Sequence, residues 1–156
     1  MKEKIGKHFD KNIFYFDFNN YPANVLSIEN WVCFAISNHK LPKQKFKTFV
    51  KNAIESDLLE FKAQGKFGED LHNEFDSTMV DLEVEKNIPI IDICTTGDNE
   101  TDLARAFWEC FYASIIPQAA DWENINIVCI NIDGKDYKNS LIDLINRFDT
   151  GWIPGG

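Results

Sequence analysis

The stretch IIDICTTGDNETDLARAFWECFY, residues 90–112, contains the local pattern that decides the fold class. It begins with β-branched and apolar residues, passes through a polar segment at residues 95–98, and continues with apolar residues at helical spacing. A strand, a polar turn and an amphipathic helix in this order are typical of an α/β unit, in which ligands bind near the turn. The stretch contains no catalytic signature, so the sequence predicts a fold class and a functional face but no specific activity.

Similar strand patterns recur along the 156 residues. Continuous apolar runs at residues 31–37 and 125–132 are expected to be strands covered on both faces. The alternating aromatic run at residues 13–18 is expected to be an edge strand. With the strand at residues 88–95, these patterns predict a single α/β domain over residues 1–156. We expect a three-layer, Rossmann-like sandwich, with a mainly parallel sheet of three central strands and the edge strand between about four helices.

Apolar residues three and four positions apart predict the helices. The first helix is expected at residues 42–62, because Pro42 suits a first helical turn and the apolar spacing continues to Phe61. Residues 64–68 are predicted to be a joint to a second helix that begins near Glu69. The glycines of this joint lack the spacing of a phosphate-binding loop, and no strand is expected before them.

Several absences in the sequence indicate the cellular compartment. No apolar run approaches the ~20 residues that a membrane span requires, so no membrane contact is expected. The charged N-terminus, in which His8 is expected to be mobile, lacks the apolar segment of a secretory signal. The four cysteines follow neither a zinc nor a redox spacing. We therefore expect a cytoplasmic protein with buried, reduced thiols.

Charge is distributed unevenly along the chain, which has a net charge of −9. Residues 67–102 contain one Lys and eleven Asp or Glu, a net charge of −10. This asymmetry argues against nucleic-acid binding, in which a basic surface supplies most of the affinity. It is compatible with attraction to a basic protein, although a solvated acidic helix face is the more common cause of such a charge run.

Polar residues follow each of the three predicted central strands. The carboxyl ends of parallel strands meet at one edge of a sheet, where ligands usually bind. This reasoning predicts a candidate binding face at that edge. Its residues are Ser37, Asn38, His39, Thr95, Thr96, Gly97, Asp98, Glu100, Asp102, Asn131 and Asp133.

Two enzyme-like or ligand-binding hypotheses fit this face. Asp98 and Asp133, together with His39, could hold Mg²⁺ for phosphoryl chemistry; otherwise no cofactor is expected. Alternatively, the turn at residues 95–97 and the following helix N-terminus could bind a nucleotide or phosphate through backbone N–H groups. The first hypothesis lacks a nucleophile motif, and the second places three carboxylates where an anion would bind.

The favoured hypothesis is a small binding module whose acidic surface engages a basic protein. Acidic side chains would steer the partner electrostatically, and an exposed aromatic side chain would anchor it. The candidate contacts are Glu69, Asp70, Glu74 and Trp122. In physical character, this small acidic protein resembles bacterial immunity or antitoxin-like inhibitors, which implies a basic toxin-like partner. The sequence leaves the oligomeric state open.

Overall fold

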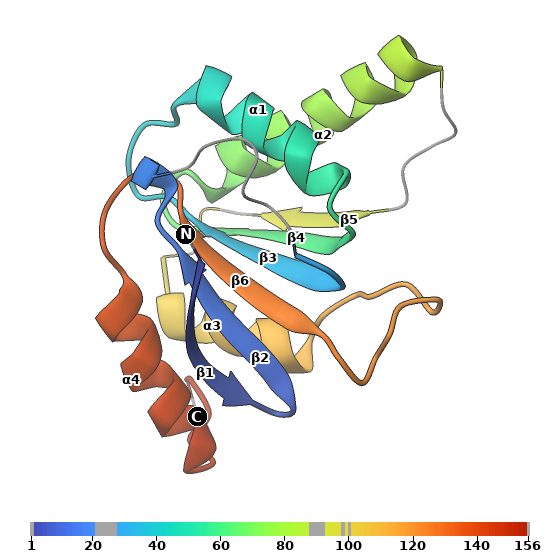
Figure 1. The fold of residues 1–156 in the computed structure, drawn as a ribbon. Helices are drawn as coiled ribbons and strands as arrows, with labels where there is room; N and C mark the ends of the chain where they lie inside the picture. The colour runs from blue at the N-terminus through green and yellow to red at the C-terminus, as the bar shows by residue number, and fades with distance from the viewer. Residues whose placement is uncertain (1, 21–27, 88–92, 98, 100, 156) are drawn as a thin grey trace.

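The computed structural model describes residues 2–20, 28–87, 93–97, 99 and 101–155, in which strands and helices alternate (Figure 1). Within these residues, six strands form one sheet in the order β1-β2-β6-β3-β4-β5. The strands are β1 (Lys2–His8), β2 (Lys11–Phe16), β3 (Trp31–Ile36), β4 (Leu58–Gln64), β5 (Cys94–Gly97) and β6 (Asn126–Asn131). The helices are α1 (Lys43–Ile54), α2 (Gly68–Lys86), α3 (Leu103–Tyr112) and α4 (Lys138–Asp149), with a 3₁₀ turn at Phe18–Asn20.

The sheet is mostly parallel. Each neighbouring pair from β2 to β5 runs parallel, and only β1 pairs antiparallel, with β2. Strand β3 lies between β6 and β4 and is buried along its whole length. This arrangement confirms the predicted α/β class and the central position of the strands predicted at residues 31–37 and 125–132.

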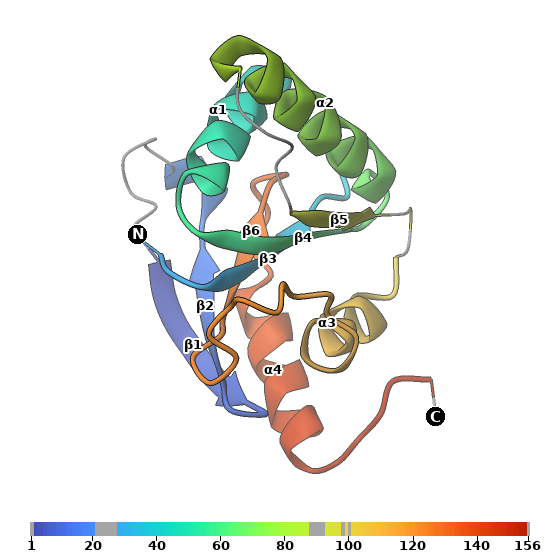
Figure 2. The same cartoon turned by 90° about the vertical axis from the view of Figure 1, so that its right-hand side faces the viewer.

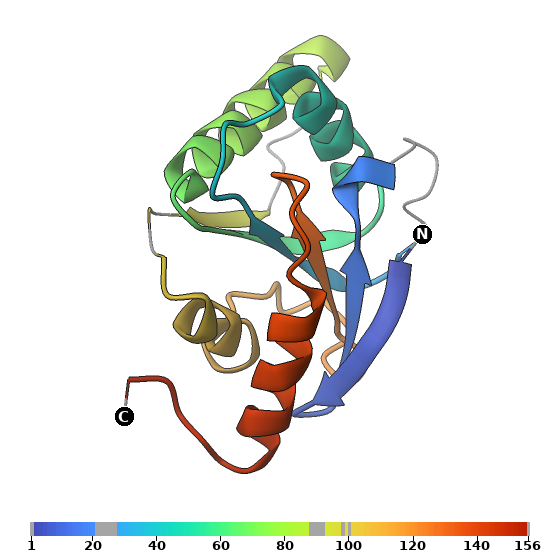
Figure 3. The same ribbon diagram turned by 90° about the vertical axis from the view of Figure 1, so that its left-hand side faces the viewer.

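Helices cover both faces of this sheet. Figure 2 shows α1 and α2 on one face and α3 and α4 on the other, and Figure 3 shows α4 beside β1. Aromatic rings fill both layers: Phe61 stacks on Phe75 below α2, and Phe34 stacks on Phe107 below α3. The core is therefore split by the sheet into two hydrophobic clusters.

The helix predicted at residues 42–62 was too long. Helix α1 ends at Ile54, the chain reverses at Asp57 with a φ of 60°, and Leu58–Gln64 forms β4. The apolar residues after Ile54 fit a helical period by coincidence, and parallel pairing with β3 decides their conformation. Residues 64–68 therefore join a strand to a helix, and a strand does precede these glycines. They still lack the spacing of a phosphate-binding loop.

The expected position of the 88–95 strand was also wrong. Its described part belongs to β5, which lies at the edge of the sheet beside β4 and includes Thr95, Thr96 and Gly97. Residues 95–97, which were expected to form a turn, are therefore the end of strand β5. Residues 88–92 lie outside the described residues.

The edge strand predicted at residues 13–18 is an interior strand, and the first residues are not a mobile tail. Strand β1 forms a hairpin with β2 and covers its outer side. His8, at the end of β1, is buried against Phe111 and Phe148 of the two helices on that face. No helix among the described residues has both the length and the apolar character to cross a bilayer.

Candidate functional site

The ends of β3 and β6 meet in a hydrogen-bonded cluster. The backbone N–H of Asn38 and the hydroxyl of Tyr137 donate to Oδ2 of Asp133, over 2.8 and 2.5 Å. The side-chain amide of Asn38 donates to the Tyr137 hydroxyl over 3.0 Å. Burial, followed by the hydrogen bond to Asp133, raises the pKa of Tyr137 to about 12, so the phenol stays protonated as a donor. The structure thus brings two predicted site residues together and uses them to join the two strand ends.

Asn131 and Ser37 also have structural roles at this edge. The Asn131 side chain, which is 2 % exposed, accepts from the N–H of Phe18 over 2.6 Å and donates to Asp17 over 3.2 Å. The buried Ser37 hydroxyl donates to the carbonyl of His39 over 2.9 Å. These bonds satisfy polar groups that the strand ends would otherwise bury without partners.

His39 follows Asn38 after β3 and is exposed, whereas Thr95, Thr96 and Gly97 are on β5, which β4 separates from this cluster. Thr95 donates to Asp76 of α2 on one side of the sheet, over 2.5 Å, whereas Thr96 lies on the other side. Asp102 caps α3 by accepting the backbone N–H of Arg105 over 3.2 Å. Asp98 and Glu100 lie outside the described residues. The described residues of the predicted face therefore form two separate groups.

Asp133 was one of the two carboxylates predicted to hold magnesium, and its oxygens accept hydrogen bonds from the protein; the other, Asp98, lies outside the described residues. Oδ1 of Asp133 accepts the backbone N–H of Lys135 over 2.9 Å, and its Oδ2 accepts the two donors described above. Both oxygens are thus engaged by the protein. In the part of the chain that the structure describes, no group of three His, Cys, Asp or Glu side chains is arranged to hold a metal ion.

A buried ion pair on β4 was missed by sequence reasoning. Glu60 is 0 % exposed and Lys62 is 8 % exposed, and both contact the backbone of the segment that follows α3. Lys62 Nζ lies 3.7 Å from Glu60 Oε1 and 3.4 Å from the carbonyl of Ala113, and Glu60 Oε2 accepts the N–H of Ile115 over 2.8 Å. Burial raises the pKa of Glu60 above its ordinary value, against the opposing effect of Lys62.

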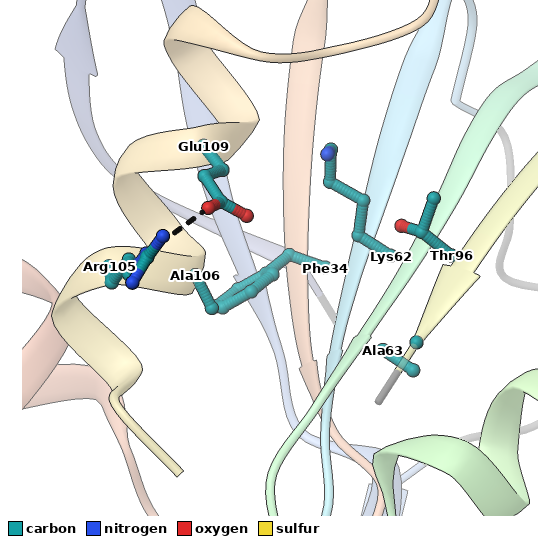
Figure 4. A pocket seen from close by; sticks show the side chains of 8 residues that line it. Phe34, Lys62, Ala63, Thr96, Arg105, Ala106 and Glu109 are labelled. Atoms are coloured by element: carbon teal, nitrogen blue, oxygen red, sulfur yellow. Dashed lines mark ion pairs between the residues drawn. The ribbon is translucent and has the colours of Figure 1, made fainter. Parts of the chain in front are cut away.

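This ion pair adjoins a cavity of about 220 Å³ between α3 and the strands β4 and β5 (Figure 4). Lys62 and Thr96 form the sheet wall, and Arg105 and Glu109, 3.5 Å apart, form the helix wall. The other lining residues are Phe34, Ala63, Gly97 and Ala106. Alternation of Glu60, Lys62 and Gln64 with less polar residues was the sequence signal for this wall, but the helix prediction concealed it.

A second hollow, of about 620 Å³, lies by the β1–β2 hairpin. Phe9, Tyr112 and Trp122 line it, and each is at least 43 % exposed. The ring centroids of Phe9 and Tyr112 are 4.9 Å apart. Trp122 thus belongs to an aromatic surface on the α3 side, whereas the other predicted contacts belong to α2 on the opposite face.

Those acidic contacts occupy the first half of α2. Glu69 and Asp70 are exposed in its first turn, where carboxylates also favour the helix dipole. Glu74 is 15 % exposed and lies 3.6 Å from Lys47 of α1. Farther along the helix, Val80 and Val84 are 54 % and 76 % exposed.

Fold and site together define an α/β protein with a doubly covered, mostly parallel sheet and a polar cavity, open to solvent, between α3 and the sheet. The chain belongs to the family described as Domain of unknown function (DUF7684), whose model matches residues 13–148. The matched region runs from β2 into α4 and includes every residue that lines the cavity. No curated protein and no solved structure matches the chain.

Proposed function

We propose that this chain is a protein-binding module that engages a basic partner through the outer face of α2. One observation carries the proposal: the two apolar side chains Val80 and Val84, one helical turn apart, are exposed beside the exposed acids Asp81 and Glu85. An apolar stripe bordered by charge is the surface that a partner helix or strand covers in many complexes.

The charge of α2 supports a basic partner. Its 19 residues include seven Asp or Glu and one Lys. Helix α1 offsets part of this charge through Lys47, which lies 3.6 Å from Glu74. The single lysine of α2, Lys86, is itself paired with Glu55 after α1, at 2.6 Å. Asp81 and Glu85 have no ion pair among the described residues, and both lie beside the exposed valines. Their charge is available to a partner, and it favours fast, salt-dependent association with a basic surface.

More specifically, the chain would act as an inhibitor that binds and covers the functional surface of a basic protein, as an immunity protein does. A rigid α/β core would hold the helix ready for binding, so that little ordering is needed on association. The proposal needs no cofactor. The acidic half-turn at Glu69 and Asp70 would extend the contact toward the start of the helix.

Site-specific photo-crosslinking in the native host cell tests the proposal directly. A photoreactive amino acid at position 84 is expected to yield one discrete protein adduct. The same residue at position 153 provides the matched control, because Ile153 is an apolar side chain that is 56 % exposed away from α2. Equal adduct patterns at the two positions, or no adduct at position 84, would contradict the proposal.

Charge reversal at Asp81 and Glu85 tests whether the acidic side chains of α2 contribute to partner binding. Asp81→Lys with Glu85→Lys should lower the yield of the adduct at least tenfold, because like charges at an interface cost several kcal/mol. The association rate of the purified partner should fall steeply between low and physiological salt. A partner that binds the double variant as well as the parent chain would rule out this role for the acidic face.

A further inference from the structure

The geometry points to a second site: we propose that the cavity between α3 and β4–β5 binds a small organic anion through Lys62, Thr96 and Arg105. The expected ligand has one carboxylate or phosphate group and a compact apolar body. This site lies on the opposite face of the sheet from the α2 surface, so the proposal is independent of the protein-binding role.

Lys62 is the principal anchor. Its side chain is 10 % exposed, and its contacts with two acceptors, 3.4 Å from Nζ to Ala113 O and 3.7 Å to Glu60 Oε1, are long for hydrogen bonds of a charged donor. An ammonium group has three N–H donors, and leaving them poorly satisfied in a buried position is costly. An oxyanion in the adjoining cavity would supply the missing short contact.

Thr96 and Arg105 provide donors on the two other sides of the cavity. The Thr96 side chain points toward Lys62 from the neighbouring strand, and among the described residues no acceptor is recorded for its hydroxyl (Figure 4). Arg105 lies on α3 across the cavity, with its Nε 3.5 Å from the carboxylate of Glu109. The remaining guanidinium N–H groups are suited to a planar carboxylate or to phosphate oxygens.

The apolar lining limits the body of the ligand. Phe34 and Ala106 face each other beside the polar donors and would contact a flat or short hydrocarbon group. The volume of about 220 Å³ is below the ~300–1,000 Å³ of typical drug-sized sites, so the ligand should be small.

Removal of the Glu109 charge should change the anion affinity in the opposite direction to removal of the Lys62 charge. The Glu109 carboxylate also lines the cavity, where it would repel a bound anion and compete for Arg105. Removing its charge should therefore tighten anion binding, although the same change removes an ion pair. A ligand of positive charge would respond in the opposite direction.

Titrations of the full chain followed by NMR test the site, with benzoate, phenyl phosphate and neutral benzyl alcohol as probes. At least one anion is expected to shift the backbone amides of Ala63, Thr96 and Ala106 with a saturable curve. Benzyl alcohol should bind at least tenfold more weakly. The two anions distinguish a carboxylate site from a phosphate site. Absence of saturable shifts with both anions, or equal binding of benzyl alcohol, would overturn the proposal.

Variants link the binding to the named side chains. Glu60→Gln with Lys62→Met removes the anchor without leaving an unpaired charge, and it should weaken anion binding tenfold or more. Thr96→Val should weaken binding by several-fold, and Glu109→Gln should tighten it. Lys66→Met, an exposed lysine after β4, is the matched control and should leave binding unchanged. If the Glu60/Lys62 variant fails to fold, Arg105→Gln at the exposed wall provides the deciding measurement, and unchanged binding there would reject the site.

Discussion

At the scale of single residues, the Glu60–Lys62 pair is the most demanding feature of the molecule. Two opposite charges lie almost fully buried on one strand, in contact with each other and with backbone groups after α3. A buried pair of this kind gives little net stability, because desolvation offsets the attraction between its charges. The free energy of unfolding should fall strongly only when one partner is removed, because the other charge is then buried without compensation.

Lys62→Met should therefore destabilise the fold strongly. The substitution leaves Glu60 buried without its cation, a loss that typically costs about 3–5 kcal/mol. Glu60→Gln combined with Lys62→Met should recover most of this loss, because no uncompensated charge remains. Denaturant unfolding of the parent chain, the single variant and the double variant measures the difference. A double variant no more stable than Lys62→Met would show that the buried charge is not the cause.

The titration of Glu60 should give the stability a characteristic pH dependence. Burial raises the pKa of Glu60 in the folded state, so the folded protein favours the protonated form. This contribution is fully present below the pKa of an unfolded glutamate, about 4.3, and is lost as the pH rises through the folded pKa. The stability of the parent chain relative to Glu60→Gln should therefore decrease with rising pH. Unfolding measurements of both proteins from pH 4 to 8 check the sign, and a relative stability that increases with pH would contradict it.

At the scale of elements, β1 shows how a charged N-terminal segment becomes part of the sheet. Its lysines point to solvent along the edge, where charge discourages pairing with other chains. His8 attaches the end of the strand to two helices: Nδ1 lies 2.6 Å from Asp149 and Nε2 lies 2.8 Å from the Tyr112 hydroxyl. The hairpin is thus secured by side-chain contacts far away in sequence.

His8→Phe should loosen this hairpin. The substitution keeps an aromatic ring against Phe111 but removes both hydrogen bonds. Asp149 and Tyr112 are 52 % and 43 % exposed and can bind water instead, so each lost bond should cost only about 0.5–1.5 kcal/mol. Hydrogen exchange of the β1 amides should accelerate, and denaturant unfolding should shift to lower concentration. His39→Phe, at an exposed loop position, is the control and should have little effect. Equal effects of the two substitutions would show that the His8 contacts do not secure the strand.

At the scale of the whole molecule, the cysteines report on global unfolding. Cys33, Cys110 and Cys129 are 0 % exposed and form no disulfide, and burial raises the pKa of each thiol. The thiolate is the reactive form, so these three residues should be inert in the folded protein. Cys94 is only partly buried, on the edge strand β5.

A thiol reagent should therefore modify one cysteine quickly in the native protein and all four in denaturant. Mass spectrometry of the modified peptides identifies Cys94 as the expected fast site, and Cys94→Ser should abolish the fast phase. Rapid native modification of two or more cysteines would mean that the layers open without global unfolding.

The candidate site could be predicted only in part. Polar residues after apolar runs placed the ends of β3 and β6 at one edge of the sheet, because parallel strands place their carboxyl ends there. That these two strands are neighbours comes from the structure. The sequence could not show that Asn38, Asp133 and Tyr137 satisfy one another. Nor could it show the cavity, because Lys62, Thr96 and Arg105 come from three elements, and β4, which holds Lys62, was wrongly predicted to be part of a helix.

The sequence by itself determined the α/β class, the two buried strands at the centre and the acidic character of α2. These features depend on local periodicity and composition, which act between residues close in the chain. Only the tertiary structure decided that residues 58–64 form a strand, that β5 lies at the edge, and that the N-terminal segment completes the sheet. The physical reason is that strand pairing joins residues far apart in sequence, and the burial gained by pairing outweighs weak local preference.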